Sequence, residues 1–331
     1  MKILLIGLGS AGQRHLRALD YLFGSQAEIY IYRGKHRRGL ISKDLKSEDF
    51  SLDPIEVYKA SELMNYSDLN SMPWDLVIIA TPPDSHFEYM RIIAPVSKRI
   101  IIEKPISVTE REAKGIYDLA KAFHIPVLIG YQMGFHPLKK LILGNLLSLG
   151  ILLSCATTYK EDLASMNPFR DMNNHHLSTQ AGGGVFPSLS HDFEFLLSIF
   201  NQTSIRNPKF TNKSYSQNKI LAACIFESSM QTQYGNFTMT NELSLLPGET
   251  QRNGLIQGVN GRIFWDYISG TFTLADNLDQ ILLQESIATD KDELFRLQIM
   301  HIMDIETLDE FCNLNLQRSV FVSEMSQLAS E

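Results

Sequence analysis

Short apolar runs alternate with segments of helical spacing over the first part of the chain. The runs are rich in isoleucine, leucine and valine, and they lie at residues 3–6, 29–32, 76–80, 100–102 and 127–129. Strands that alternate with helices are typical of a parallel sheet joined by crossover helices. We therefore predict an α/β fold whose N-terminal Rossmann domain, residues 1–128, is a doubly wound parallel sheet. Such sheets bind ligands at the carboxyl ends of their strands.

Two helices of this domain have recognisable starts. The sequences SHFE at residues 85–88 and TERE at residues 109–112 each place a hydroxyl three residues before a carboxylate. This spacing fits a capping box, in which both side chains satisfy amide groups of the first turn. We expect a helix to begin at each site, shortly after a strand ends.

The pattern changes in the second part of the chain. Between residues 219 and 283, runs rich in Thr, Phe, Ile and Tyr alternate with Gly, Asn and Ser. This is typical of antiparallel strands joined by tight turns, with a hairpin predicted at VNGRI, residues 259–263. A helical tail is expected at residues 292–328. We therefore predict that residues 129–331 form an α+β domain with an open, mostly antiparallel sheet, a class that also supplies surfaces for oligomerisation.

One uncharged stretch, residues 141–159, approaches the length that spans a bilayer. It contains Asn145, and Gly150 separates a part with helical spacing from a part that alternates like a strand. A helix followed by a strand is the better interpretation, so we expect no membrane segment. Glycines also interrupt the apolar start of the chain before it reaches the length of a signal-peptide core, which argues against export.

Composition narrows the possible functions. The chain has 331 residues, of which 44% are hydrophobic and 20% charged, and its formal net charge is -7. A chain of this length is expected to form two domains. A negative net charge argues against general nucleic-acid binding, which needs a clustered basic surface. Small neutral or anionic ligands remain open. The cysteines are too far apart for a C-x-x-C motif or a disulfide framework, so we expect a cytoplasmic protein.

The sequence GLGSAG at residues 7–12 follows the first strand and precedes a helical segment. In this context the first glycine permits a tight turn, the second lets the backbone approach a pyrophosphate, and the third allows close helix packing. The helix amides and dipole would then hold the phosphates. The alternative is a glycine turn without a ligand. The cofactor contacts predicted here are Gly7, Gly9, Ser10, Ala11 and Gly12.

The choice between NAD and NADP is read at the end of the second strand, where a carboxylate would bind a ribose hydroxyl. Residues 29–43 contain no Asp or Glu, whereas Arg33 is followed by a basic segment at residues 35–38. A guanidinium suits a 2′-phosphate because it binds two oxygens at once. The sequence therefore favours NADP over NAD, with a solvated basic loop as the alternative.

The sequence IIEKPI at residues 101–106 places a lysine directly after a buried apolar run. A charge there is costly unless it is paired or used. This loop and ATPPDSHFE, residues 80–88, both follow strand ends, so we expect both to border the nicotinamide. Burial and a nearby cation lower the pKa of a lysine toward the range useful for proton transfer. The alternative is a lysine paired with its neighbouring glutamate. The cofactor contacts predicted from the two loops are Thr81, Pro82, His86, Glu103 and Lys104.

Several motifs, in their order, resemble the Gfo/Idh/MocA oxidoreductases, named for glucose-fructose oxidoreductase and inositol dehydrogenase. They are GLGSAGQRH, ATPPDSH, EKP, GYQMGFHP at residues 130–137 and AGGGVFPSLSHDFEFL at residues 181–196. GVNGRIFWDY and the terminal helices agree with them, so the resemblance covers essentially the whole chain. The form of the glycine-triplet motif is similar to members found in surface-polysaccharide and amino-sugar pathways.

The resemblance implies that the Rossmann domain is followed by a substrate-binding and oligomerisation domain, residues 129–331. It also implies an NAD(P)-dependent oxidoreductase acting on the secondary alcohol or ketone of a sugar, sugar nucleotide or cyclitol. It implies that Lys104 transfers the proton of the substrate hydroxyl. It also implies that His191 lies on the other side of the substrate, as an acid/base group or a hydrogen-bond partner. Tyr131, Ser188 and His175 are further substrate contacts that we expect. Relatives commonly form homodimers or homotetramers. No metal site is expected, because the histidine pair at residues 175–176 lacks a third ligand at useful spacing.

The chain departs from the family pattern around the expected substrate site. Ser188 stands where relatives of this form usually carry aspartate, and Gly134 and Met172 stand where arginine is common. An aspartate would orient the imidazole of His191, and Glu194, three residues further on, is a candidate replacement. These departures leave a second function open, a non-catalytic dinucleotide-binding sensor or partner subunit with the same fold.

Overall fold

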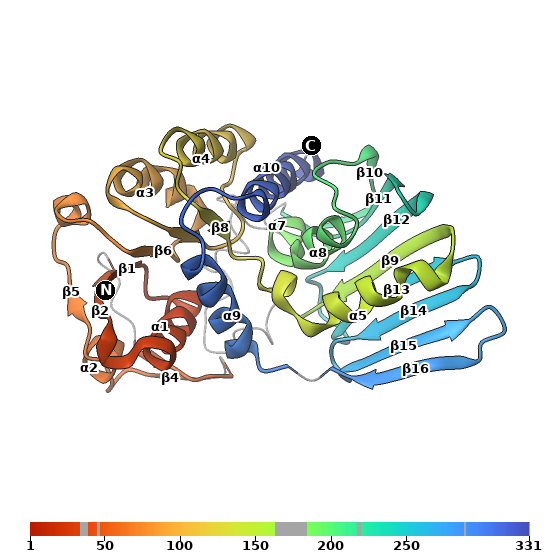
Figure 1. Cartoon of the computed structure of the whole chain (residues 1–331), viewed down its shortest axis with the longest axis horizontal. Coiled ribbons are helices and arrows are strands. Elements are labelled where there is room, and N and C mark those ends of the chain that lie inside the picture. Colours follow the sequence, from red (N-terminus) through yellow and green to blue (C-terminus); the bar gives the residue numbers. More distant parts are fainter. Residues whose placement is uncertain (34–38, 45–46, 163–183, 217–219, 288, 331) are drawn as a thin grey trace. The chain divides into compact units, whose positions relative to one another are not determined.

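The computed structural model describes residues 1–33, 39–44, 47–162, 184–216, 220–287 and 289–330. The chain divides into two compact units. The first contains Met1–Tyr131 and Lys291–Gln327, and the second contains most of the remaining residues. Each unit is built on a sheet of its own, and most helices and strands of both are labelled in Figure 1.

The first unit contains a six-stranded parallel sheet, which confirms the predicted doubly wound fold. In spatial order its strands are β5 (Ser61–Glu62), β2 (Glu28–Tyr32), β1 (Lys2–Ile6), β6 (Leu76–Ile79), β7 (Ile100–Ile102) and β8 (Val127–Ile129). All residues of β6, β7 and β8 are buried, as expected where helices cover both faces of a sheet. The strand order reverses between β1 and β6, and doubly wound sheets bind ligands at such a point.

Helices and short turns connect these strands. The helices are α1 (Ser10–Phe23), α2 (Pro54–Val57), α3 (His86–Ile93), α4 (Glu110–Ala122), α9 (Lys291–Met303) and α10 (Glu310–Ser330). The 3-10 turns are η1 (Gly24–Gln26), η2 (Tyr66–Asn70), η3 (Pro83–Ser85) and η4 (Ala94–Val96). A small sheet of β3 (Leu40–Ile41) and β4 (Glu48–Asp49) lies in the connection from β2 to α2.

The C-terminal helices pack with the first unit. The sequence predicts a boundary after residue 128 and a helical tail in the second domain. In the structure, Lys291–Gln327 belongs to the first unit instead. Helix α9 packs against α1, where Asp292 binds Arg14 at 3.0 Å and Arg17 at 3.2 Å. Local patterning cannot show this contact, because Arg14 and Asp292 are 278 residues apart along the chain.

The two expected capping boxes have different outcomes. At the start of α4 the Thr109 hydroxyl accepts a hydrogen bond from the Glu112 amide at 3.3 Å and donates to the Glu112 carboxylate at 3.1 Å. At the start of α3, Ser85 makes no capping bond, so the capping box predicted for SHFE is wrong, although the helix begins there as expected. The turn η3 already gives Ser85 a helical conformation, and its hydroxyl donates to the carbonyl oxygen of Pro82 at 2.8 Å. A capping side chain needs an extended backbone instead.

The second unit contains an eight-stranded sheet that is antiparallel except between β12 and β9, which confirms the predicted α+β class. Its strands in spatial order are β10 (Arg206–Tyr215), β11 (Leu221–Thr232), β12 (Gly235–Ser244), β9 (Leu152–Lys160), β13 (Gln251–Gly258), β14 (Gly261–Asp266), β15 (Thr271–Asp276) and β16 (Ile281–Ser286). The helices and turns are η5 (Gln132–Phe135), α5 (Pro137–Asn145), η6 (Leu146–Leu149), α7 (Val185–Leu189) and α8 (His191–Ile199). Helices α7 and α8 contact the sheet (Figure 1).

Aromatic side chains fill the space between α7, α8 and this sheet. The ring of Phe186 on α7 lies 5.3 Å from that of Phe193 on α8 and 5.6 Å from that of Phe226 on β11, measured between centroids. All three rings are fully buried. Tilted and edge-on pairs of this kind are the favoured aromatic geometries. The cluster holds α8, the helix that begins at His191.

The uncharged stretch at residues 141–159 is a helix followed by a strand, as predicted. Helix α5 and turn η6 lead to Gly150, and β9 follows. Gly150 has a φ of 68°, a left-handed conformation that glycine adopts without a steric penalty. Across the described residues, we find no helix of sufficient length and apolar character to cross a membrane.

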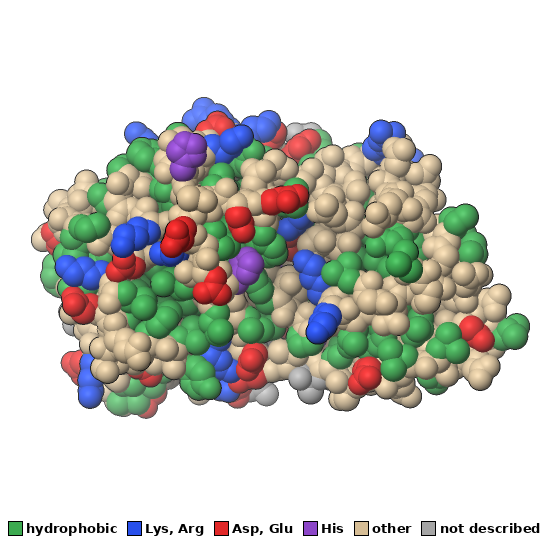
Figure 2. All heavy atoms as spheres, in the orientation of Figure 1, with side chains coloured by type: hydrophobic (Ala, Val, Ile, Leu, Met, Phe, Trp, Pro, Cys, Tyr) green, Lys and Arg blue, Asp and Glu red, His purple; other side chains and the backbone are tan. Residues whose placement is uncertain are grey.

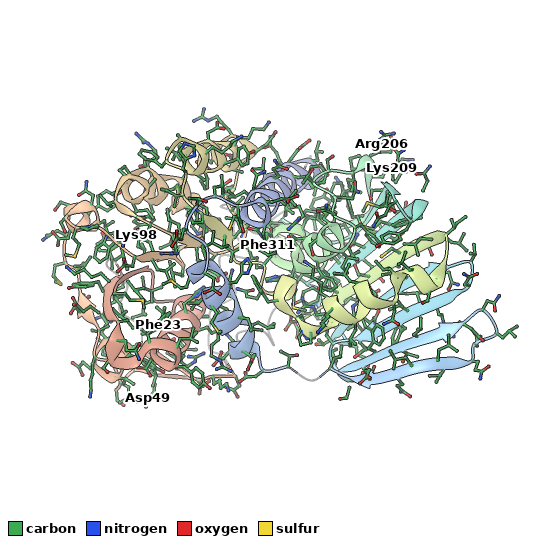
Figure 3. The ribbon with its side chains drawn as sticks, viewed as in Figure 1. Phe23, Asp49, Lys98, Arg206, Lys209 and Phe311 are labelled. Atoms are coloured by element: carbon green, nitrogen blue, oxygen red, sulfur yellow. The ribbon has the colours of Figure 1, made fainter. Side chains whose placement is uncertain are left out.

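Charged side chains lie on the surface of the molecule without gathering in one basic area on the face shown. In Figure 2, Lys and Arg side chains are interspersed with Asp and Glu. The edge strand β10 carries exposed Arg206 and Lys209, which are labelled in Figure 3, and Pro208 lies between them. Charges and proline on an edge strand oppose pairing with a further strand.

The hairpin predicted at VNGRI joins β13 to β14, with Gly258 paired to Gly261. Further along the hairpin, Gly254 lies opposite Trp265. A Cβ atom at position 254 would lie 2.0 Å from Cζ2 of this fully buried indole. The indole therefore occupies the space that a side chain would need.

Replacing Gly254 with alanine is expected to lower the free energy of unfolding by about 1–3 kcal/mol, because the new methyl group overpacks Trp265. Urea denaturation measures the change. Gly248→Ala is the matched control, since a Cβ atom there would meet nothing within 4 Å. The control should change the free energy by no more than about 0.5 kcal/mol. Equal losses in the two variants would contradict this account of the packing.

Candidate functional site

The loop after β1 brings two glycines against neighbouring backbone. Gly7 has a φ of 96°, and a Cβ atom there would lie 2.5 Å from the carbonyl oxygen of Ala80, directly after β6. A Cβ atom at Gly12 would lie 2.2 Å from the carbonyl oxygen of Gly7. Neither position has room for a side chain. The absence of side chains lets α1 begin close to the carboxyl ends of β1 and β6.

The start of α1 carries no side-chain cap. Gly9 is the N-cap residue, and the first turn of Ser10, Ala11 and Gly12 contains no acidic residue. The amide groups at a helix start, together with the helix dipole, attract anions. These residues therefore fit the pyrophosphate of a dinucleotide, which they would hold through backbone N–H groups.

His86 connects the loops that follow β6 and β7. Its ring is buried, with Nε2 2.8 Å from the carbonyl oxygen of Thr81 and Nδ1 3.1 Å from that of Ile106. Burial lowers the pKa of His86, and a neutral imidazole can donate to one of these two carbonyls at a time. The Thr81 and Ser85 hydroxyls lie 2.7 Å apart, and Pro82 between them in sequence is exposed. His86 thus ties together two loops predicted to contact the cofactor.

Glu103 is fixed by a histidine that the sequence analysis missed. The Nε2 atom of His15, on α1, lies 2.7 Å from Oε1 of Glu103, and both residues are buried. Phe295 of α9 contacts the His15 ring edge-on at 4.7 Å. Gly130 leaves space for the carboxylate, because a Cβ atom at position 130 would lie 3.0 Å from it. In the sequence, the place of His15 at the end of the motif GLGSAGQRH was the one feature that could have indicated its role.

Lys104 directly follows this fixed glutamate. It is half-buried, and the peptide bond between Lys104 and Pro105 is cis. Strand β7, which precedes Lys104, pairs in parallel with β6, which precedes Thr81. The two residues therefore follow adjacent strands at the same edge of the sheet, where ligands of doubly wound folds bind.

Arg33, the first residue after β2, is held by two carboxylates. Its Nη1 and Nη2 atoms each donate to one oxygen of Asp53 at 2.8 Å. Nε and Nη2 donate to Glu62 at 2.8 Å and 3.1 Å. The side chain is 3% exposed, and its hydrogen bonds to Asp53 raise the pKa of Arg33 above its ordinary value. The guanidinium expected to meet a 2′-phosphate thus already has two anionic partners.

In the second unit, Arg252 joins α8 to the sheet. It binds Asp192 through Nη2 at 2.8 Å and through Nε at 3.2 Å. Its guanidinium lies over the rings of Tyr159 at 4.3 Å and Tyr267 at 4.8 Å. Asp192 is buried, so this pairing compensates a charge that would otherwise be costly. Arg252 therefore fixes the first turn of α8, and no local pattern in the sequence marked it.

The site residues predicted from the motif at residues 181–196 lie on α7 and α8. His191 is half-buried and begins α8. Ser188 is buried on α7, where its hydroxyl donates to the carbonyl oxygen of Gly184. Glu194 is buried on α8, and its spacing puts it on the side of the helix that carries His191. Its role in orienting the imidazole remains a prediction. Tyr131, in the first unit, is also buried.

Several predicted positions lie outside the described residues, namely His175, His176, Met172 and the basic segment at residues 35–38. Gly134 lies in η5. A Cβ atom there would meet nothing within 4 Å. Gly134 lines an open groove of about 650 Å³ with His136, Lys139 and Leu143. A longer side chain would therefore have space at this position.

Replacing His15 with alanine is expected to lower the free energy of unfolding by about 3 kcal/mol, because buried Glu103 loses its hydrogen bond to the imidazole. Urea denaturation of the single variants His15→Ala and Glu103→Ala and of the double variant measures the coupling. The double variant should lose less than the sum of the two single losses. Strictly additive losses would show that the two side chains do not stabilise each other.

His136 is the N-cap residue of α5, and its Nδ1 atom accepts a hydrogen bond from the Leu138 amide at 3.2 Å. Its ring contacts Tyr267 edge-on at 5.4 Å. Burial, followed by the charge of Arg252, lowers the pKa of His136 from 6.5 to about 4. As the pH falls, the unfolded chain therefore takes up a proton before the folded chain does, and this favours unfolding.

The contribution of His136 to stability should be complete above pH 6.5 and should be lost as the pH falls from 6.5 to about 4. We expect the loss to be about 1–2 kcal/mol after allowing for partial solvent screening. His136→Asn keeps a capping acceptor but does not titrate. Urea denaturation across this range should show a smaller fall for the variant. Parallel falls in the two proteins would contradict the assignment to His136.

The N-terminal part of the chain matches a known family. The model described as "Oxidoreductase family, NAD-binding Rossmann fold", GFO_IDH_MocA, matches residues 1–131. The rhizopine catabolism protein MocA of Rhizobium meliloti is 31% identical over 202 residues, which are 57% of this chain and 54% of MocA. The chain thus spans about half the length of this curated relative.

Solved structures show the same fold over the whole chain. Levoglucosan dehydrogenase in complex with NADH and L-sorbose has a TM-score of 0.76 at 15% identity, covering 100% of this chain and 96% of that one. Biliverdin reductase from Synechocystis sp. PCC 6803, in complex with biliverdin and NADP+, has a TM-score of 0.73 at 13% identity, covering 98% of each chain. Such identities show the fold alone. The match to the Gfo/Idh/MocA oxidoreductase family is therefore a match of the NAD-binding Rossmann domain, residues 1–131.

Proposed function

We propose that this protein is an NAD(P)-dependent oxidoreductase that transfers a hydride between nicotinamide and a secondary alcohol or ketone of a sugar, sugar nucleotide or cyclitol. The glycine loop carries the proposal, because Gly7 and Gly12 have no room for a side chain and α1 begins without a side-chain cap. The position of Lys104 at the end of β7, in the same sheet, supports it. In the proposal the cofactor contacts are Gly7, Gly9, Ser10, Ala11, Gly12, Arg33, Thr81, Pro82, His86, Glu103 and Lys104.

Lys104 is the proposed group for the hydroxyl proton. In oxidation the alcohol carbon gives up a hydride, the hydroxyl gives up a proton, and a carbonyl forms; reduction reverses these transfers. The bound nicotinamide supplies the hydride acceptor or donor. Lys104 must be neutral to take the proton, whereas an ordinary lysine is charged at neutral pH. The cation of an oxidised nicotinamide would favour the neutral amine.

His191 is the second proposed acid/base group. Its position at the first turn of α8 is supported by the aromatic cluster and by the pair of Arg252 and Asp192, which hold that helix. Glu194 is the proposed partner that orients the imidazole in place of the aspartate that relatives carry. Tyr131, Ser188 and His175 are proposed as further substrate contacts.

A polyol or sugar substrate is supported by the names and ligands of similar proteins. MocA is named for rhizopine catabolism, and the structure of levoglucosan dehydrogenase holds L-sorbose. Biliverdin reductase shares the fold and binds biliverdin, so the fold alone does not select a polyol. The choice of substrate class therefore rests on the EKP and glycine-triplet motifs.

The finer proposals concern the nucleotide, assembly and location. In the sequence, Arg33 and the basic segment at residues 35–38 favour NADP as the nucleotide. We propose a homodimer or homotetramer, since the open sheet exposes apolar side chains such as Leu153 and Phe264. A cytoplasmic location is supported by Cys155, Cys224 and Cys312, each of which is free and buried.

Lys104→Met is expected to reduce turnover by about 10²–10⁴-fold, because it removes proton transfer. Nucleotide affinity should fall far less than turnover, because the contacts of the glycine loop remain. Turnover is followed by cofactor absorbance with a panel of sugars, sugar nucleotides and cyclitols. Lys98→Met is the matched control. Lys98 precedes β7 at its other end and pairs with Asp75 on the surface (Figure 3), so it should retain activity.

The same assays separate the two candidate functions. Undiminished turnover of Lys104→Met would exclude Lys104 as the proton-transfer group. Nucleotide binding by the wild-type protein without turnover of any substrate in the panel would favour the non-catalytic dinucleotide-binding function. Failure to bind either nucleotide would refute both.

A further inference from the structure

The guanidinium of Arg33 is nearly saturated by carboxylates. An arginine has five N–H donors, and four hydrogen bonds from Arg33 reach Asp53 and Glu62. Both edges of the planar group are used, one facing Asp53 and the other facing Glu62. To bind a phosphate through two N–H groups, this guanidinium would have to release at least one of these partners.

The cluster lies at the strand end where doubly wound folds read the ribose of a dinucleotide. Arg33 follows Tyr32, whose carbonyl oxygen accepts a hydrogen bond from the Gly7 amide at 2.8 Å. Glu62 belongs to β5, which pairs with β2, and Asp53 is the N-cap residue of α2. The carboxylates absent between residues 29 and 43 are therefore supplied from two later segments of the chain.

The chemistry of this cluster separates the two nucleotides. The 2′-phosphate of NADP carries nearly two negative charges and would compete with Asp53 and Glu62 for one guanidinium. Like charges this close repel each other, and the buried position of Arg33 weakens solvent screening. The 2′-hydroxyl of NAD is neutral and can donate to a carboxylate oxygen, so it needs no release of Arg33.

We infer that Asp53 and Glu62 are specificity-determining residues that make the site prefer NAD(H) to NADP(H), and that Arg33 is a positioning residue that holds them. The inference rests on the proposed function and specifies its nucleotide. It differs from the preference predicted from the sequence, because that prediction treated Arg33 as available for a phosphate.

The test is the ratio of the dissociation constants for NADP(H) and NAD(H), measured by isothermal titration calorimetry. The wild-type protein should bind NAD(H) more tightly. In Asp53→Asn/Glu62→Gln, the ratio should shift toward NADP(H) by about tenfold, because the guanidinium becomes available to phosphate oxygens. Glu56→Gln is the matched control, since this exposed carboxylate on α2 makes no hydrogen bond to Arg33. It should leave the ratio unchanged.

Two further variants keep the result interpretable. Asp53→Asn preserves the N-cap of α2, because asparagine also caps helices. This single variant should shift the ratio of dissociation constants toward NADP(H) by about threefold. It tests the inference even if the double variant does not fold. Arg33→Gln should weaken the binding of NAD(H) and NADP(H) to a similar degree, since Asp53 and Glu62 both lose their hydrogen bonds to the guanidinium. Circular dichroism checks the folding of each variant.

The outcomes distinguish this inference from the proposed function. Preferential binding of NADP(H) by the wild-type protein, with selective loss of NADP(H) affinity in Arg33→Gln, overturns the inference and leaves the function standing. An unchanged ratio in Asp53→Asn and in the double variant also overturns it. If the wild-type protein binds neither nucleotide, the inference and the proposed function fail together.

Discussion

The close backbone contact at Gly7 is the constraint on which the first unit depends. A Cβ atom at this position would lie within 2.5 Å of the carbonyl oxygen of Ala80, and one at Gly12 would lie within 2.2 Å of that of Gly7. With any larger residue, the helix α1 would have to move away from the ends of β1 and β6. Its first amide groups would then no longer lie at the edge where the strand order reverses. The capacity of this edge to attract an anion is therefore a consequence of missing side chains.

Buried polar contacts then fix the loops around this edge. His15 ties the glycine helix to Glu103, and His86 ties the loop after β6 to the loop after β7. Arg33 ties the end of β2 to Asp53 and Glu62 in the same way. Each contact joins segments that are distant in sequence and places a buried polar group against a partner, without which its burial would be costly. The loops are thus held before any ligand arrives, which reduces the ordering cost of binding.

The second unit uses a similar device beneath its candidate acid/base residue. Arg252 pairs with Asp192 and stacks on Tyr159 and Tyr267, so the residue next to His191 has a fixed position. The charge of Arg252 also contributes to the low pKa of His136. One buried cation therefore affects both the start of α8 and the titration of the cap of α5.

The sequence by itself determined the strands, the glycine loop, the hairpin at VNGRI and the change from helix to strand at Gly150. These features depend on side-chain periodicity and on the backbone freedom of glycine. Both are properties of residues that are close together in the sequence. Only the tertiary structure decided the partners of Arg33, the bond between His15 and Glu103, and the packing of α9 on α1. Those partners lie 20 to 278 residues apart along the chain. Strand order and helix packing bring them together, so no local pattern could reveal which charges meet.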